Sequence, residues 1–444
     1  MTDPANPKLT DSLVDAALLL AAVSLAALIH PLAIAVAALV CALTIGALRI
    51  RSAALLPRGM GMAGWTLLVF GVYVAASAAW SVDPAFSLMS ALPLLLAVLI
   101  GLPCVILLAQ RGPGIEASWP ALLTVAVVAG LIVFEAATGG LLRRMIPGGA
   151  GLFALLVAFL TVMIWPMAAM LQVRYSWREA LVWIAGGLIA IVLSDHPSFL
   201  WAALSGLVAF GIAMASSVLA RIVLIFCVLA VGFGPAVLAT FVGSGAFELP
   251  AQIEPHLSAW PAALSVWAST PIQGTGAGTA VPEMLALPGQ SVALQLLIGV
   301  GGIGLILGIV AVIAVILRAV TRESSAWRGA CAAGLIGAGL AMALSGPGIW
   351  QPWWIAALAA AAIGIAGAAP VAAGGASLGS IFDHARAAEE EEEEDDGLYH
   401  FDDDDDYDDD YDDDEDENGE WDIDDSQVDR GDTGPRQDAE EKRG

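Results

Sequence analysis

The chain has 444 residues, of which 58% are hydrophobic and only 14% are charged, and its formal net charge is −26. So apolar a composition argues against a soluble globular domain. Its few, scattered cations argue against nucleic-acid recognition, which depends on clustered lysine and arginine to neutralise phosphates.

Apolar segments long enough to cross a bilayer follow one another over most of the chain. Crossing roughly 30 Å of hydrocarbon at 1.5 Å per residue takes about 20 apolar residues. The ten-residue alternation typical of a transmembrane barrel is not visible, whereas helices satisfy their own backbone groups in lipid. We therefore predict an all-α integral membrane protein with about twelve transmembrane helices. The expected spans are residues 13–28, 32–48, 64–79, 89–108, 121–137, 151–171, 180–193, 199–217, 223–242, 292–317, 329–344 and 354–369.

The first two expected spans are separated only by His30 and Pro31. Proline lacks an amide hydrogen and clashes with the preceding helical turn, so it favours a tight helical hairpin over one long helix. The first span has no basic flank and no convincing small-residue cleavage site. We therefore expect no cleavable signal peptide.

Arginine in alternate connections predicts the orientation of the spans. With the amino terminus in the cytoplasm, nearly all arginines of the short loops fall on the inside, in keeping with the positive-inside rule. They are Arg49, Arg51, Arg58, Arg111, Arg174, Arg178, Arg221, Arg318, Arg322 and Arg328. An even number of spans then places the carboxyl terminus in the cytoplasm too. The segments expected on the outside surround Trp80, Arg143, Asp195, His256 and Gly348.

Two short outer connections carry side chains of chemical interest. Arg143 and Arg144 are adjacent, and such a pair either binds an anionic group or reaches lipid phosphates from the membrane boundary. Asp195 and His196 are neighbours at an expected helix end. We interpret them either as an acid and base pair or as a turn in which Asp195 caps the following helix.

A long periplasmic loop between the ninth and tenth spans, residues 243–290, is the main expected place for a site. It contains His256 and Trp260, ends at Gln290, and is followed by Ser291. His256 is either a base or a solvated loop residue. Trp260 is either a platform for a sugar or a member of the interfacial aromatic belt.

The outer segments share residue spacing with a known family. The first outer loop has a W-S-x-x-P pattern from Trp80 to Pro84. In the long loop, a proline and two glycines follow Trp260 by 11, 14 and 16 residues, namely Pro271, Gly274 and Gly276. Leu294, Gln295 and Gly301 then open the tenth span. In these features residues 10–345 resemble the O-antigen ligase and polymerase family of bacterial inner-membrane glycan transferases.

The resemblance implies a multi-pass protein of the bacterial inner (cytoplasmic) membrane that transfers a glycan from a polyprenyl diphosphate to a hydroxyl acceptor. Direct attack would invert the anomeric configuration. In the family, arginines hold the diphosphate and a histidine of the long loop assists the attacking hydroxyl. Here His256 stands in place of the loop arginine, while Gln290 and Ser291 stand in place of the histidine and an asparagine.

Five residues receive roles under this resemblance. Arg143 and Arg144 would bind the diphosphate, and His256 would act as a base or contact a phosphate. Gln290 would donate or accept a hydrogen bond from a sugar, since an amide takes up no proton near neutral pH. Trp260 would contact the substrate.

Composition divides the chain into four regions: a short cytoplasmic amino terminus (residues 1–12), a polytopic membrane domain (13–370), a flexible linker (371–388) and an acidic cytoplasmic tail (389–444). Residues 389–425 hold 26 of the 44 acidic residues and no lysine or arginine, which leaves 18 acids against 18 basic residues elsewhere. Self-repulsion and few apolar residues predict that the tail is disordered.

The acidic tail keeps other functions open. It is expected either to be a solvated spacer or to bind a basic protein or divalent cations, because hard cations prefer carboxylate oxygens. A non-catalytic membrane scaffold that uses this tail is the main alternative to a transferase. A transporter is a third, although the only acids in the expected spans, Asp15 and Glu135, lie near span ends, which argues against proton coupling. The remaining expected partners are membrane lipids and, from the resemblance, a polyprenyl-diphosphate-linked glycan.

No motif predicts a metal or an organic cofactor. The cysteines lie in or beside apolar spans without a C-x-x-C pair, so packing is their expected role. They are Cys41, Cys104, Cys227 and Cys331. No zinc motif, complete phosphate loop or nucleophile elbow is present in the sequence. We expect no resident cofactor and no metal site.

Overall fold

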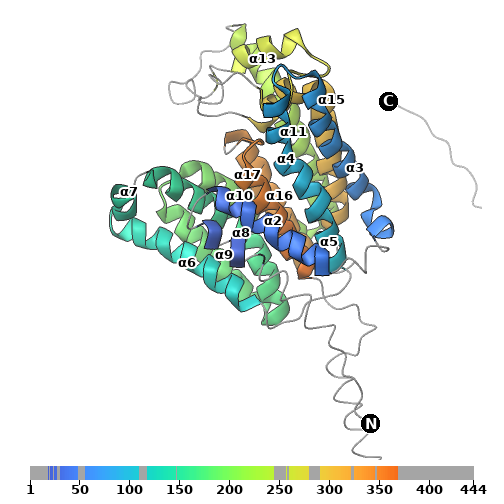
Figure 1. Cartoon of the computed structure of the whole chain (residues 1–444). Helices are drawn as coiled ribbons and strands as arrows, with labels where there is room; N and C mark the ends of the chain where they lie inside the picture. Colours follow the sequence, from blue (N-terminus) through green and yellow to red (C-terminus); the bar gives the residue numbers. More distant parts are fainter. Residues whose placement is uncertain are drawn as a thin grey trace, which may run out of the picture. The chain divides into compact units, whose positions relative to one another are not determined.

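The computed structural model describes residues 19, 21–23, 25–27, 31–48, 56–109, 118–146, 148–244, 257, 260–279, 291–321, 325–345 and 348–368. Every regular element among these residues is a helix (Figure 1). Within these described ranges, seven helices are long and apolar enough to cross a membrane, and two shorter apolar helices accompany them. The chain is therefore an all-helical, multi-pass membrane protein, as its composition predicts.

Helical segments cover most of the described residues of the expected spans, but the eighth expected span, residues 199–217, runs across a helix break at Ser216. They are α2 (Pro31–Leu48), α3 (Leu56–Ala76), η2 (Ser77–Trp80), α4 (Pro84–Leu96), the π-helical η3 (Ala97–Gly101), α5 (Leu102–Ala109), α6 (Ser118–Ala137), α7 (Leu141–Met145), α8 (Gly149–Arg174), α9 (Trp177–Leu193), α10 (Pro197–Ala215), α11 (Ser217–Gly243), α13 (Trp260–Ser269), α15 (Val292–Ala319), α16 (Ala326–Ser345) and α17 (Pro352–Gly367). Of the first expected span, residues 13–28, only 19, 21–23 and 25–27 are described, and they are helical. The linker and the acidic tail, residues 371–444, lie outside the described residues.

α8 is the most enclosed of the candidate membrane-spanning helices. Of an 18-residue stretch of α8, 89% is buried inside the protein, against 28% for the corresponding stretch of α11. It packs against α6, α9, α10, α16 and α17, so side chains on all its faces meet other helices. A helix that is apolar all round suits such a central position.

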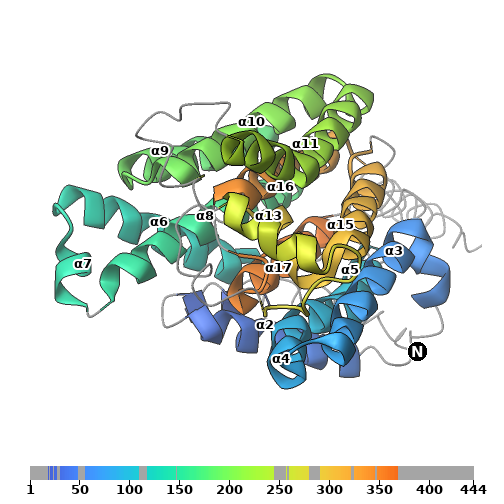
Figure 2. The same ribbon diagram turned by 90° about the horizontal axis from the view of Figure 1, so that it is seen from above.

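Trp165 of α8 fills a slot between α10 and α16, which lie side by side in Figure 2. Glycine lines this slot: a Cβ atom placed on Gly206 of α10 would lie 2.5 Å from Cζ2 of Trp165 and 2.7 Å from the carbonyl oxygen of Gly334 in α16. Small residues at helix interfaces let backbones approach closely, and in lipid this packing replaces the hydrophobic driving force. The slot therefore sets how closely α8, α10 and α16 pack.

Gly206→Ala is expected to lower the free energy of unfolding by about 1–3 kcal/mol, the usual range for overpacking a close-packed core. The added methyl group collides with a fully buried ring and with backbone, neither of which moves easily. Thermal unfolding of the purified protein measures the effect. Gly211→Ala on the same helix is the matched control, because a Cβ there meets nothing within 4 Å. Equal free energies of unfolding for Gly206→Ala and Gly211→Ala would contradict the close packing described around Trp165.

α15 is interrupted at Gly301, whose φ of 70° and ψ of −172° lie outside the helical region. Residues 271–276, which follow α13, pair with the backbone on both sides of this break. Before the break, the amides of Thr275 and Gly276 donate to the carbonyls of Ile298 and Gly299, at 2.9 and 2.8 Å. Non-helical backbone persists in a membrane protein only where protein or trapped water satisfies it.

Pairing continues beyond the break. The amide of Gly302 donates to the carbonyl of Pro271 at 2.9 Å, and that of Ile303 donates to Ile272 at 3.3 Å. Contact is so close that a Cβ on Gly301 would lie 2.6 Å from the amide nitrogen of Gly274. The proline and glycine spacing of the long loop thus corresponds to a turn that docks on a broken helix.

Candidate functional site

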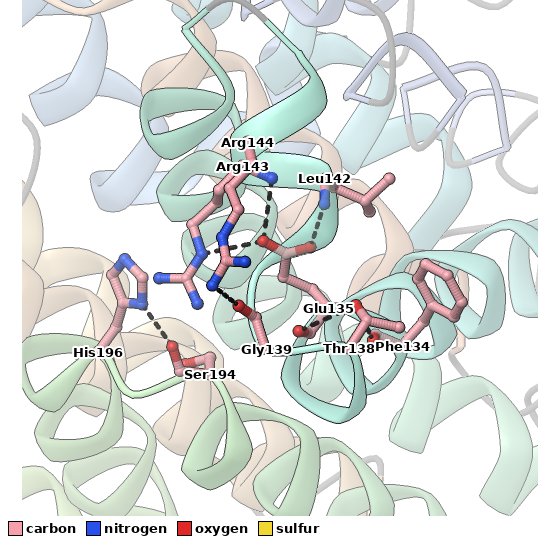
Figure 3. Close-up of polar contacts among 9 residues, drawn as sticks. All are labelled: Phe134, Glu135, Thr138, Gly139, Leu142, Arg143, Arg144, Ser194 and His196. Atoms are coloured by element: carbon pink, nitrogen blue, oxygen red, sulfur yellow. Dashed lines mark hydrogen bonds and ion pairs between the residues drawn. The ribbon is translucent and has the colours of Figure 1, made fainter.

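The turn between α6 and α8 folds two arginines back over the end of α6 (Figure 3). Gly139 and Gly140 follow α6 with φ of 63° and 91°, a left-handed conformation that glycine adopts without steric penalty. The short helix α7 comes next and carries Arg143 and Arg144 in its last turn. Gly148, with φ of 73°, then precedes α8. The chain reverses twice within a few residues, and this brings α7 against α6 and α8.

Glu135, in the last turn of α6, anchors this double turn. Its side chain is fully buried. Its Oε1 accepts hydrogen bonds from the backbone amide of Arg143 at 3.0 Å and from Nε of Arg143 at 2.9 Å, while Oε2 accepts from the amide of Leu142 at 2.6 Å. A buried carboxylate is tolerated when it is paired and hydrogen-bonded, and both oxygens here have donors. Glu135 therefore fixes where Arg143 lies.

The two arginines keep donors available for a further group. The side chain of Arg143 is 36% exposed, and its guanidinium lies over the ring of Phe153, 4.8 Å from the centroid. Arg144 is exposed and donates from Nη2 to the carbonyl of Gly139 at 2.8 Å. Within the described part of the chain, the terminal nitrogens of Arg143 and the Nε and Nη1 of Arg144 have no hydrogen-bond acceptor. Planar guanidinium groups with such vacancies are well suited to phosphate oxygens.

His196 lies beside these arginines and comes from the turn between α9 and α10. Its Nδ1 is 2.8 Å from the carbonyl oxygen of Ser194. A carbonyl oxygen only accepts, so Nδ1 carries the proton in the neutral ring and Nε2 is left with its lone pair. The ring stacks on Phe199 with centroids 6.0 Å apart and also contacts Phe153 at 5.4 Å. Phe153 therefore contacts both His196 and Arg143.

The structure changes the interpretation of Asp195. His196, and not Asp195, is the N-cap residue of α10, and its side chain makes no capping hydrogen bond. Asp195 instead has a positive φ of 56°, which aspartate tolerates better than most residues. The ring of His196 is held by the carbonyl of Ser194, so the expected helix cap by Asp195 is wrong. The reason is that the left-handed residue, Asp195, lies one position before the N-cap, His196.

The W-S-x-x-P pattern, from Trp80 to Pro84, forms a helix start. Asp83 is the N-cap of α4 and accepts from the amide of Phe86 at 3.0 Å, and Pro84 occupies the first helical turn. Proline at this position suits a helix because its missing amide hydrogen is not needed there. Just before it, Nε1 of Trp80 donates to the carbonyl of Gln273 at 2.9 Å. The first loop and the docked turn of the long loop therefore meet.

Gln295 joins a third segment, around Ile349, to this group. It is 5% exposed, and its Oε1 accepts from the amide of Ile349 at 3.0 Å. Nearby, Ser87 donates to the carbonyl of Ala277, and the amide of Ala277 donates to the hydroxyl of Ser77 at 3.0 Å. These side chains hold backbone segments together. The spacing of the motif residues in these segments therefore has a structural explanation.

The predicted site residues fall in different places. Arg143 and Arg144 lie together on α7, which packs on α6 and α8, whereas Trp260 begins α13, which packs on α11 and α15. Trp260 is 7% exposed, so its ring is packed in the protein and presents little surface to a sugar. His256 and Gln290 lie outside the described residues. In the parts of the chain that are described, no three His, Cys, Asp or Glu side chains gather as metal ligands.

We call Arg143, Arg144 and the residues that contact them the arginine site. Two of its members, Glu135 and Phe153, received no role in the sequence analysis. Glu135 carried a usable signal, because an acid in an apolar span points to a nearby cationic partner. The adjacent glycines Gly139 and Gly140 mark the reversal that lets Arg143 return to it. Phe153 carried none, since it is one of many apolar residues in α8.

Comparison with protein-family models, with curated proteins and with solved structures gives no match to this chain.

Proposed function

We propose that the protein is a glycan transferase of the O-antigen ligase and polymerase type in the bacterial inner membrane, which moves a glycan from a polyprenyl diphosphate to a hydroxyl acceptor. The arginine site carries this proposal. Glu135 fixes Arg143, and the free nitrogens of Arg143 and Arg144 form a donor edge at one end of the helices. Fixed cationic donors are what a diphosphate leaving group requires.

The proposed reaction is a direct displacement. An oxygen of the acceptor attacks the anomeric carbon, the bond from that carbon to the diphosphate oxygen breaks, and the acceptor proton passes to a base. Arg143 and Arg144 stabilise the charge that develops on the leaving oxygens, because their geometry is set before the reaction. His256 as base or phosphate contact and Gln290 as sugar contact complete the proposal, with Trp260 as a substrate contact only through the small exposed part of its ring.

Twelve spans with both termini in the cytoplasm complete the proposed topology. Contacts between distant segments support it. Trp80 bonds to Gln273, and Gln295 bonds to Ile349, which joins three segments expected outside. At the opposite, inner ends, Nε of Arg221 donates to the carbonyl of Val320 at 2.6 Å. A long periplasmic loop, residues 243–290, follows from this arrangement.

Complementation of a ligase-deficient or polymerase-deficient bacterial strain tests the proposal. The wild-type chain is expected to restore the lipopolysaccharide ladder, and the double variant Arg143→Ala, Arg144→Ala is expected to reduce it at least about tenfold through loss of charge-assisted hydrogen bonds. Arg178→Ala is the matched control, because Arg178 is a second exposed arginine, stacked 5.6 Å from the ring of Trp177. It is expected to restore the ladder fully.

The alternative function is a non-catalytic scaffold, and the concentration of acidic residues in 389–425 favours it. A deletion of these residues in the same complementation experiment separates the two. A transferase keeps its ladder without the tail, whereas a scaffold loses the localisation of a basic partner or its bound divalent cations. A wild-type chain that inserts into the membrane of a matched host and restores no ladder would contradict the transferase.

A further inference from the structure

Among the residues that the structure describes, Nε2 of His196 has no hydrogen-bond partner. We infer that His196 is a third, protonation-dependent contact for the phosphate group that binds at Arg143 and Arg144. The inference rests on the proposed function, because it concerns the same site, and it adds that proton uptake accompanies binding.

Geometry fixes which nitrogen is available. Nδ1 of His196 is held by the carbonyl of Ser194 at 2.8 Å, which leaves Nε2 for a ligand. The stacked ring of Phe199 and the contact with Phe153 restrain the rotation of the imidazole. In Figure 3 the guanidinium of Arg143 lies between that of Arg144 and the imidazole of His196. Both groups contact the ring of Phe153: the guanidinium carbon of Arg143 lies 4.8 Å and the ring centroid of His196 lies 5.4 Å from its centroid.

Chemistry then gives the direction of the effect. A neutral imidazole with its proton on Nδ1 presents a lone pair at Nε2, which repels a phosphate oxygen. A protonated imidazole donates from both nitrogens, one to Ser194 and one to the ligand. An anion therefore binds the protonated ring more tightly, and by linkage its affinity rises as pH falls through the range in which imidazole titrates.

The charged groups near His196 come from α7, from α6 and from the turn that holds His196 itself. α7 supplies two basic side chains, Arg143 and Arg144. Glu135 of α6 lies behind Arg143 and is bonded to it, and Asp195 in the same turn is exposed. From α8 and α10 the ring meets only uncharged phenylalanines. Histidine is thus the residue type at this site whose charge ordinarily changes near neutral pH.

The shared ligand chemistry is a phosphate or diphosphate, either free in solution or as the headgroup of a lipid. Binding of inorganic pyrophosphate to the full-length protein in nanodiscs is measured at about pH 6 and about pH 8. A second arm measures a fluorescent polyprenyl diphosphate in the nanodisc bilayer and its displacement by pyrophosphate. Tight lipid binding with displacement identifies a lipid headgroup site, whereas binding of pyrophosphate alone identifies a site for soluble phosphate.

His196→Gln is the test variant, and Asp195→Asn is the matched control. The gain in wild-type affinity from the higher to the lower pH is expected to exceed that of His196→Gln by about tenfold, the effect of one charge-assisted hydrogen bond. Protonation of the ligand itself is common to both proteins, so the ratio isolates the imidazole. Asp195→Asn keeps a residue that tolerates positive φ and is expected to retain the wild-type pH dependence.

Equal pH dependence in the wild type and His196→Gln would overturn the inference. The proposed function would stand in that case if Arg143→Ala, Arg144→Ala still abolished binding at both pH values. Absence of binding by the wild type in both arms would overturn the arginine site and the inference together. His196→Asn, judged folded by size-exclusion chromatography and thermal unfolding, replaces His196→Gln if the latter fails to fold.

Discussion

Gly301→Ala is expected to lower the free energy of unfolding by about 4 kcal/mol and to release the docked turn from α15. Two causes act together. The backbone of Gly301, with φ of 70° and ψ of −172°, lies in a region that is open only to glycine. An added Cβ also overlaps the carbonyl of Ile272 and approaches the amide nitrogen of Gly274 to 2.6 Å. Thermal unfolding measures the loss of stability.

Gly61→Ala separates the two causes. Gly61 has nearly the same backbone conformation, with φ of 53° and ψ of −173°, but a Cβ there meets nothing within 4 Å. It is expected to show only the conformational penalty, about 1–3 kcal/mol. Hydrogen exchange is the specific readout, because the amides of Thr275 and Gly276 donate to carbonyls of α15 and are expected to be protected in the wild type. If these amides stay protected in Gly301→Ala, the docking geometry described for the turn is incorrect.

Glu135→Ala is expected to have the second largest effect, a loss of about 3 kcal/mol with detachment of α7. Removal of the carboxylate leaves the amides of Leu142 and Arg143 and the Nε of Arg143 without their acceptor. Trypsin supplies a local readout, because the bonds after Arg143 and Arg144 become cleavable once α7 unfolds. Thermal unfolding supplies the global one.

A double-mutant cycle isolates the ion pair within this effect. Arg143→Ala alone leaves a buried carboxylate that still accepts two backbone amides, and the double variant Glu135→Ala, Arg143→Ala leaves no charge uncompensated. The double variant is therefore expected to lose less than the sum of the single losses, with a coupling of about 1–2 kcal/mol. Additive losses, or a Glu135→Ala protein as resistant to trypsin as the wild type, would argue that Glu135 does not hold the turn.

Hydropathy was sufficient to predict the helices, because lipid leaves a long apolar segment few alternatives to a helix. It could not predict the break in α15. Gly301 lies in an apolar run that reads as one uninterrupted helix. The residues that bond to the backbone just after the break, Pro271 and Ile272, are far away in the sequence. Hydropathy contains no term for such a long-range backbone contact.

The arginine site was only partly predictable for a related reason. Arg143 and Arg144 were recognised because charge is rare in this membrane domain, and the same rarity makes Glu135 informative. The position of His196 could not be foreseen, since it depends on Phe153 and on the carbonyl of Ser194. The burial of Trp260 could not be predicted from the sequence either, because it follows from how α13 packs on α11 and α15.

The interruption of α15 separates a part long enough to cross the lipid from a part that packs on the docked turn. From Gly302 to Ala319 the helix rises about 27 Å at 1.5 Å per residue, which is close to the hydrocarbon thickness. The part from Val292 to Val300 is therefore not needed as an anchor in the lipid. Its docking turn precedes it in the chain, so the turn has already left the ribosome when this short half-helix emerges. In this order of synthesis, the half-helix can fold directly against a turn that is already present.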